Sequence, residues 1–362
     1  MPTAMRDGAP LVLVAGAVAQ RPGVGGHAWV YLQWLLGLRA LGCRVAFVDR
    51  LLPDDVQAQV RWLADVFSPH ELTVLIVGHD PIPRADLLLD VMGYADVAAR
   101  QRVFVDVDPG FGQLWAELGL HDPYSGYDAH VTVGAAIGSP SCSVPTRELN
   151  WIPTLPPVYL PAWPVTARGS SWTTVASWRG PFGPIEYAGR SYGLRAHEFR
   201  RLLGVARDDD IELALAIDPS DDADRRALIG AGWRLVDPAR VAGSPASYRA
   251  YVQGSAGELC VAKQLYVMTR GGWFSDRSAC YLASGKPVVA QDTGWTSALP
   301  SGEGLLAFDD TGQALDALAR VRSDPARHAR AARELAESHL SSDVVLRRLL
   351  DRLGAAARQG AA

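Results

Sequence analysis

Short runs of apolar residues alternate with longer amphipathic segments along the chain. A short apolar run bounded by polar residues or glycine is typical of a parallel strand that is buried on both faces. A helix is predicted over His27–Leu41, where apolar residues recur at helical spacing until Gly42 ends it. In the first half, strands are predicted at Leu11–Gly16, Arg44–Asp49, Leu72–Val77, Val103–Val107 and His130–Val133.

A stretch rich in proline and tryptophan, Trp151–Pro164, interrupts this alternation. Proline continues neither a helix nor a central strand, so the stretch is predicted to link two domains. The last helix should bury one face, which carries Leu346, Leu349, Leu350 and Leu353. Alternation of this kind predicts an α/β fold with two Rossmann-like, doubly wound domains. Strands of the second domain are predicted at Trp172–Trp178, Ile211–Ile217, Trp233–Val236, Pro287–Ala290 and Leu305–Phe308.

Length and charge narrow the class of protein. A chain of 362 residues suggests two domains. A net charge of −4 argues against nucleic acid as a partner, because binding it needs a concentrated positive field. The four cysteines form no CxxC pair, which argues against both a disulfide framework and a zinc site. The apolar run Pro10–Ala19 is too short to span a membrane and lacks a basic leader, so a cytoplasmic protein without membrane insertion is expected.

One helix start combines features of an anion site. Ser275 is a natural N-cap, Asp276 suits the first turn, and Gly285 should end the helix. Free backbone N–H groups and the helix dipole attract anions to such a terminus. Arg277 and Ser278 would add a guanidinium and a hydroxyl for a diphosphate. The alternative is an ordinary capped helix with solvated charges.

A resemblance to the donor half of bacterial group-1, family-4-type glycosyltransferases is carried by Ala283–Ala290, Asp292–Gly294 and Gly302–Phe308. It covers most of Gly271–Leu353 and the N-terminal half in outline. The resemblance implies the GT-B arrangement, in which two domains face a cleft: 1–160 on the acceptor side, 161–340 on the nucleotide-sugar side, and a helix at 341–362 crossing back. It implies a nucleoside diphosphate sugar as co-substrate, with no cofactor and no bound metal.

The chain departs from that family at two positions. The family places two glutamates eight residues apart before the glycine and proline, and Gly272 and Cys280 stand there instead. The second glutamate normally holds the donor ribose, so this contact must differ or be lost. The cluster Ser275–Ser278 resembles a variant found in a branch that includes spore-protein-like glycosyltransferases.

Further donor contacts follow from the same resemblance. A basic residue in this part of the donor domain meets the diphosphate in related transferases, which makes Lys263 and Arg249 candidates. The loop that includes Gly25 and Gly26 would let backbone approach a ligand in the cleft. His27 would then be the base toward an acceptor hydroxyl, a phosphate contact, or only a packing residue at the start of the helix.

Asp106 and Asp108 end a predicted strand and lie on one face of it. Ligands gather at the carboxyl ends of strands in open α/β sheets. The two carboxylates would bind acceptor hydroxyls, act as base or hold a metal, or they only cap the following turn.

Together these features predict a glycosyltransferase that moves a sugar from a nucleoside diphosphate sugar to a small-molecule acceptor. Many Ala, Arg and Gly with few Lys are typical of high-GC bacteria, where specialised metabolites are common acceptors. Two alternatives remain: a nucleotide-sugar epimerase of the same fold, and a non-catalytic relative that binds nucleotide sugars.

Overall fold

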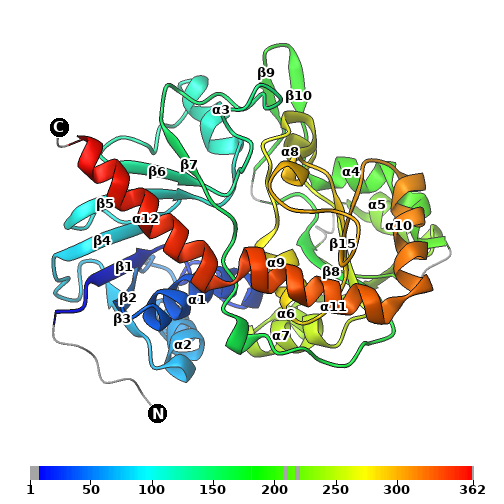
Figure 1. Cartoon of the computed structure of the whole chain (residues 1–362), viewed down its shortest axis with the longest axis horizontal. Coiled ribbons are helices and arrows are strands. Elements are labelled where there is room, and N and C mark those ends of the chain that lie inside the picture. The colour runs from blue at the N-terminus through cyan, green and yellow to red at the C-terminus, as the bar shows by residue number, and fades with distance from the viewer. Residues whose placement is uncertain (1–7, 181, 208–210, 217–220, 361–362) are drawn as a thin grey trace.

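The computed structural model describes residues 8–180, 182–207, 211–216 and 221–360. Its first half forms a seven-stranded parallel sheet in the order β3-β2-β1-β4-β5-β6-β7 (Figure 1). Helices α1 (Gly25–Ala40), α2 (Val56–Phe67) and α3 (Phe111–Glu117) belong to this half. The strands are β1 (Leu11–Ala15), β2 (Arg44–Asp49), β3 (Thr73–Ile76), β4 (Ala85–Val91), β5 (Ala99–Asp106), β6 (Ala129–Thr132) and β7 (Trp151–Pro153).

All five strands predicted for this half are present, and two more join them. Strand β4 lies in the middle of the sheet beside β1, although its apolar run is bounded by Asp86 and Asp90. The prediction that the linker begins at Trp151 is wrong by one strand, because Trp151–Pro153 pairs with β6. Strand β7 lies at the edge of the sheet, where the missing N–H of Pro153 is tolerated.

The second half forms a six-stranded parallel sheet in the order β12-β11-β8-β13-β14-β15. The five predicted strands are present, while β13 was not predicted and residue 217 lies outside the described residues. Strands β9 (Ile185–Tyr187) and β10 (Arg190–Tyr192) form an antiparallel hairpin beside α3. The sheet consists of β8 (Trp172–Ser177), β11 (Ile211–Ala216), β12 (Arg234–Val236), β13 (Gly257–Cys260), β14 (Val288–Gln291) and β15 (Leu305–Phe308).

Both sheets reverse their strand order beside the first strand, as Rossmann-like sheets do. The predicted fold class is therefore confirmed. Short 3₁₀ helices lie at Ser68–His70, Leu160–Ala162, Leu203–Arg207 and Trp295–Ser297. The helices of the second half are α4 (Arg195–Arg201), α5 (Asp222–Gly230), α6 (Pro238–Ala242), α7 (Pro245–Gln253), α8 (Gln264–Thr269), α9 (Asp276–Ala283), α10 (Thr311–Ser323), α11 (Pro325–Leu335) and α12 (Ser342–Gly360).

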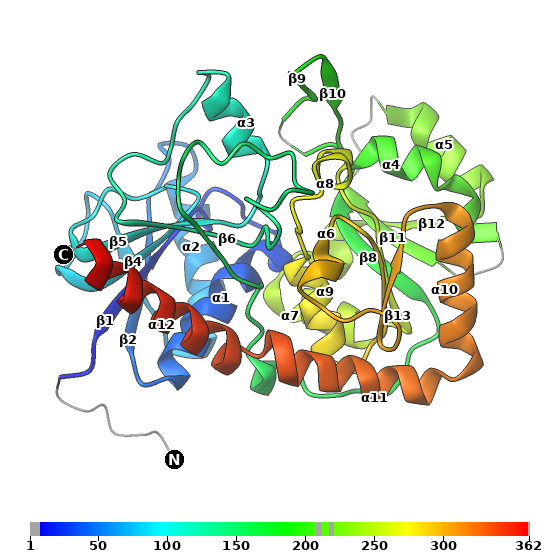
Figure 2. The same ribbon diagram turned by 45° about the horizontal axis from the view of Figure 1, so that its top comes forward.

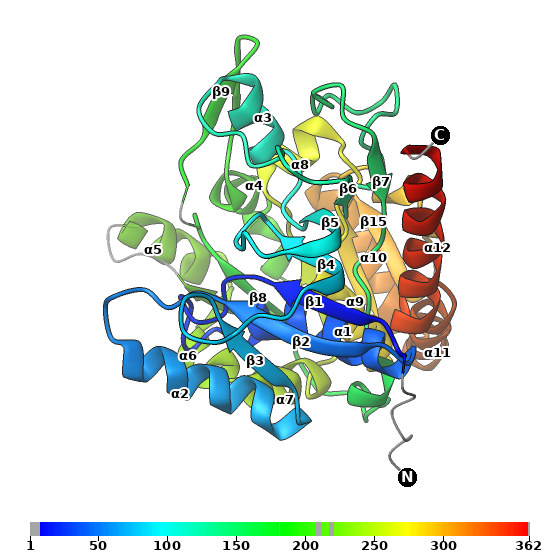
Figure 3. The same cartoon turned by 90° about the vertical axis from the view of Figure 1, so that its left-hand side faces the viewer.

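Helices α11 and α12 run one after the other along both halves (Figure 2). A π-helical turn, Ala336–Leu340, joins them, and α12 packs against α1 beside β7 (Figure 3). The predicted apolar face of α12 is confirmed, since Leu346, Leu349 and Leu353 are buried and Leu350 is partly buried. The first sheet uses residues 11–153 and the second uses 172–308, so the boundary expected near residue 160 falls between them.

The largest apolar core is continuous between the halves. It joins Trp34 of α1 to Trp163 of the linker and to Trp273 and Tyr248 of the second half. Burial of such large side chains holds the two sheets against one another. None of the helices in the described ranges has the length and apolar character that a membrane span requires.

Candidate functional site

A salt bridge joins the two domains where β5 and β13 end. Asp108 follows β5, and its carboxylate accepts hydrogen bonds from Nζ of Lys263 at 2.8 and 2.7 Å. Lys263 follows β13, and the hydroxyl of Tyr266 donates a further hydrogen bond to Asp108. The Asp108–Lys263 pair, with Tyr266, is called the cross-domain ion pair below. It lies at the carboxyl ends of strands, where α/β proteins bind their ligands.

The short segment that carries Lys263 is held by buried polar groups. Arg195 donates from Nε to the carbonyl of Val261 at 3.0 Å. The side-chain oxygen of Gln291 accepts from the backbone N–H of Ala262 at 3.1 Å. Both polar side chains are buried, so these bonds replace water and fix the backbone just before Lys263.

Positive charge gathers around the lysine. Burial lowers the pKa of Lys263, the Asp108 carboxylate opposes this, and the nearby Arg195 and Arg21 lower it further. Lys263, Arg195 and Arg21 therefore lie near Asp108, and a second carboxylate, that of Asp106, lies next to Asp108. A ligand with two or more negative charges, such as a diphosphate, is of the right charge to take the place of Asp108 beside Lys263 and Arg195.

Asp106 lies beneath this pair and has a different environment. Its buried carboxylate accepts from Nε2 of Gln113 at 2.7 Å and from Oγ1 of Thr132 at 2.9 Å. It also accepts from the backbone N–H of Asp108 at 3.1 Å, which shapes the turn that carries Asp108. Burial raises the pKa of Asp106 to about 6. The two aspartates lie close together, and the hydrogen bonds of Asp106 stay within the first domain while those of Asp108 reach the second.

His27 lies in the first turn of α1. Its Nε2 is 3.0 Å from the carbonyl oxygen of Ala17, and its ring meets Tyr31 edge-on. A carbonyl accepts, so Nε2 carries the proton and only Nδ1 keeps a lone pair. Burial, with a contribution from Arg21, lowers the pKa of His27 to about 4. The imidazole is therefore neutral at pH 7, and its role as base stays a prediction.

The predicted cap of helix α9 is present, but the helix start is covered. Oγ of Ser275 accepts from the backbone N–H of Arg277 at 3.2 Å. Asp276 lines a cavity of about 50 Å³ between α9, α1 and the linker. Small-molecule sites usually measure about 300–1,000 Å³, so this cavity is too small to hold a nucleotide sugar in this arrangement of the domains.

The guanidinium of Arg277 is already occupied. It forms a buried ion pair with Glu258 of β13 and donates to the carbonyl of Val175 at 2.8 Å and to Sγ of Cys260 at 3.2 Å. Glu258 has no exposed surface, so Arg277 neutralises a charge inside the second domain. Ser278, beside it on α9, is fully buried as well.

The remaining candidates lie where α1 meets the second domain. A side chain at Gly25 would come within 2.1 Å of the carbonyl oxygen of Ser244, and one at Gly26 within 2.9 Å of the ring of Tyr248. The two glycines thus allow the domains to touch in this structure. The guanidinium of Arg249 lies 5.9 Å from the ring centre of Trp29.

Cys280 stands where the family has its second glutamate. Its Sγ accepts from Nε2 of Gln33 on α1 at 3.4 Å, so this position of α9 faces the first domain. The main-chain N–H of Tyr159 donates to the other end of the Gln33 amide at 2.6 Å. Through Gln33, this position of α9 is therefore joined to α1 and the linker.

Arg195, Tyr266 and Gln291 were not predicted. Each gains its position from strands or loops that are distant in the sequence, and none belongs to a recognisable motif. One signal was available in the sequence. Gln291 is a polar residue at the end of a buried strand, and ligand sites lie at such strand ends.

No family model matches the sequence, and no curated protein sequence matches it significantly. Solved structures match over nearly the whole chain. HepE of Anabaena, in complex with UDP-glucose, is 10% identical, with 96% of this chain and 100% of that chain covered and a TM-score of 0.58. AviGT4, a glycosyltransferase involved in avilamycin A biosynthesis, is 13% identical, with 94% and 96% covered and a TM-score of 0.55. The N-terminal domain of Candida albicans trehalose-6-phosphate phosphatase is 8% identical, with 98% of each chain covered and a TM-score of 0.59. At such identities the match shows the fold, and this fold is GT-B.

Proposed function

We propose that this protein is a glycosyltransferase that moves a sugar from a nucleoside diphosphate sugar to a small-molecule acceptor. The observation that carries the proposal is the ion pair of Lys263 with Asp108 across the two domains, at the carboxyl end of a strand beside the switch point of the second sheet. This is where a diphosphate would be bound in a sheet of this kind. The UDP-glucose complex of HepE supports the choice of donor class.

In this proposal Lys263 exchanges partners during the reaction cycle. The donor diphosphate takes the place of the Asp108 carboxylate, and the ammonium then stabilises the charge that develops as the sugar leaves. Asp108 is released at the edge of the acceptor domain, where it can accept a hydrogen bond from an acceptor hydroxyl. Arg195 and Gln291 keep Lys263 in place throughout.

Domain separation belongs to the proposed cycle. The cavity beside Asp276 is too small for a nucleotide, so the donor enters when the domains part and is enclosed when they close. Enclosure limits hydrolysis of the donor by water. We include in the proposal a cytoplasmic location, no cofactor besides the donor, and a specialised metabolite as acceptor. Ser275, Asp276, His27 and Asp106 stay candidate contacts rather than assigned ones.

A non-catalytic protein that binds nucleotide sugars is the second candidate. It is favoured by Cys280, which faces Gln33 instead of presenting a glutamate to a ribose. Arg277 favours it as well, because its guanidinium is already bound by Glu258.

A donor assay separates the two candidates. UDP-, TDP- and GDP-glucose are incubated with the protein for several hours, with water and added small alcohols as acceptors of the glucosyl group, and release of nucleotide is followed by chromatography. We expect release from at least one donor, a loss of about 100-fold or more in Lys263→Ala, and partial retention in Lys263→Arg, which keeps the charge. Binding by calorimetry without release would favour the second candidate, and no binding of any of the three would contradict both.

A further inference from the structure

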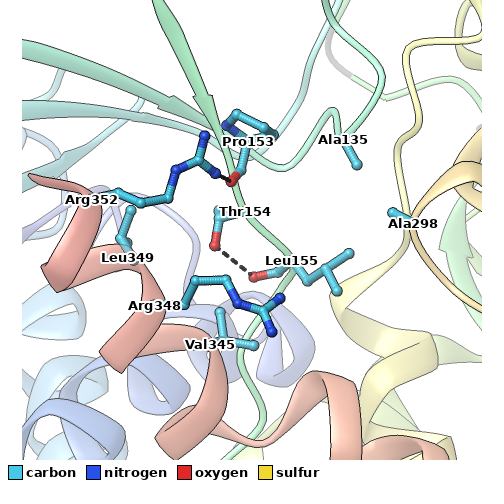
Figure 4. Close-up of a pocket in the computed structure, with 9 residues that line it drawn as sticks. All are labelled: Ala135, Pro153, Thr154, Leu155, Ala298, Val345, Arg348, Leu349 and Arg352. Carbon is cyan, nitrogen blue, oxygen red and sulfur yellow. Dashed lines mark hydrogen bonds between the residues drawn. The ribbon is translucent and has the colours of Figure 1, made fainter.

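A second cavity, of about 280 Å³, opens where α12 passes the carboxyl ends of β6 and β7 (Figure 4). It shares no residue with the cross-domain ion pair. The first domain contributes Ala135, Pro153, Thr154 and Leu155 to its wall, and the second domain contributes Ala298. The last helix contributes Val345, Arg348, Leu349 and Arg352.

Two guanidinium groups of one helix face line this cavity. Arg348 and Arg352 are one turn apart on α12, a spacing at which like charges repel by about 0.2–0.5 kcal/mol. Nη1 of Arg352 donates to the carbonyl of Pro153 at 2.7 Å, while no acidic partner of either arginine is found among the described residues. The neighbouring Arg347, in contrast, pairs with Asp343 at 2.8 Å and does not line the cavity.

The rest of the wall is largely apolar. Leu155, Val345 and Leu349 supply aliphatic surface, with Ala135 and Ala298 at the side where the domains meet (Figure 4). An apolar surface beside two unneutralised guanidiniums is complementary to a compact apolar body that carries an anionic group. Guanidinium groups bind carboxylate and phosphate through paired N–H donors.

We propose that this cavity binds a small anionic molecule, with its phosphate or carboxylate on Arg348 and Arg352 and its apolar body against Leu155 and Leu349. The volume is near the lower end of the range for small-molecule sites, so the ligand is smaller than a nucleotide sugar. The site goes beyond the proposed function, because anion binding here needs neither a donor nor sugar transfer.

The position of the cavity gives the ligand an effect on domain closure. The backbone N–H of Ala135 donates to the carbonyl of Gly272 at 3.3 Å, across the contact between the two domains. A molecule that touches Ala135, Ala298 and α12 at once contacts all three parts that meet there. Its binding should therefore favour the closed arrangement of the domains.

Calorimetry with the whole protein in the absence of nucleotide tests the site. The probes are phenyl phosphate, benzoate and the neutral benzyl alcohol. We expect at least one anion to bind, its affinity to fall about tenfold or more in Arg348→Ala and in Arg352→Ala, and Arg347→Ala to bind as the original protein does. Phenyl phosphate and benzoate distinguish a phosphate from a carboxylate as the natural group.

Three results would overturn the proposal: no binding of either anion, equal binding of benzyl alcohol, or the same loss in Arg347→Ala as in the other two variants. The last would mean that the general charge of α12 attracts the probes. Circular dichroism of each variant confirms that the fold is kept. All three arginines are exposed, so their removal should leave it intact. Because no nucleotide is present, failure here leaves the donor assay unaffected.

Discussion

Two aspartates that are separated by one residue after strand β5 differ in what surrounds them. Asp106 is enclosed by Gln113 and Thr132, while Asp108 reaches the other domain. Alternation along the strand was sufficient to predict that both lie at the same edge of the sheet. It could not predict Lys263 as a partner, because that contact joins residues 155 positions apart.

We predict a pH-dependent stability for Asp106. Its pKa of about 6 is above the ordinary 3.8, so between these values the folded protein binds a proton that the unfolded chain has lost. The extra bound proton stabilises the folded state at low pH, and this stabilisation is lost as the pH rises through about 6. Relative to Asp106→Asn, the original protein should lose about 2–3 kcal/mol of unfolding free energy between pH 4 and pH 7. Urea denaturation at several pH values measures this difference.

The exposed Asp65 provides the control for this comparison. Asp65→Asn should follow the original protein across the same pH range within about 0.5 kcal/mol. A constant difference between Asp106→Asn and the original protein at all pH values would contradict the raised pKa.

Strands and helices were predicted well where their own residues determine them. The purely apolar runs of β1 and β15 identified those strands directly. Strand β13 was missed because it contains Glu258, and a carboxylate is tolerated in a buried strand only when a distant residue neutralises it. That residue is Arg277, nineteen positions further along the chain. Information of this kind is absent from any local pattern.

The contact between α1 and α12 depends on a glycine. Gly37 lies in the middle of α1, and a Cβ atom there would come within 2.6 Å of Cδ1 of Leu346 and Cβ of Ser342. Alanine normally stabilises a helix relative to glycine by about 0.5–1 kcal/mol. At Gly37 overpacking should outweigh this gain, so we expect Gly37→Ala to destabilise the protein by about 1–3 kcal/mol. Thermal unfolding gives the stability, and amide hydrogen exchange should show faster exchange in α12.

Gly230, at the end of α5, is the matched control because nothing lies within 4 Å of its position for a Cβ. Gly230→Ala should leave the stability unchanged or raise it slightly. If Gly37→Ala did the same, α12 would not be packed against α1 as closely as the structure shows.

For the molecule as a whole, the cross-domain ion pair connects domain closure with ligand binding. The position of Asp108 at a strand end followed from the sequence, and Lys263 was named as a candidate through the family resemblance, although the strand that precedes it was missed. Their mutual contact could not be predicted, since it depends on how two separately folded sheets are set against each other.

We predict that Asp108→Asn binds UDP more tightly than the original protein does. If Asp108 competes with the diphosphate for Lys263, removing its charge should raise the affinity about 3–10-fold, which corresponds to about 0.6–1.4 kcal/mol. Lys263→Ala should bind UDP more weakly in the same calorimetric titration. Loss of affinity in Asp108→Asn would show that Asp108 contributes to the nucleotide site instead of competing for it.

The strap formed by α11 and α12 also has a consequence for how the protein is made. The face of α1 around Gly37 leaves the ribosome some 300 residues before Leu346, which covers it. At a synthesis rate of about 5–20 residues per second, this apolar surface stays uncovered for about 15–60 s before α12 is made. The first domain is thus incomplete for most of translation and becomes stable only when the chain is nearly finished. A cell that makes this protein has to protect that surface in the interval, and a ribosome that stalls late would leave an unfinished chain prone to aggregation.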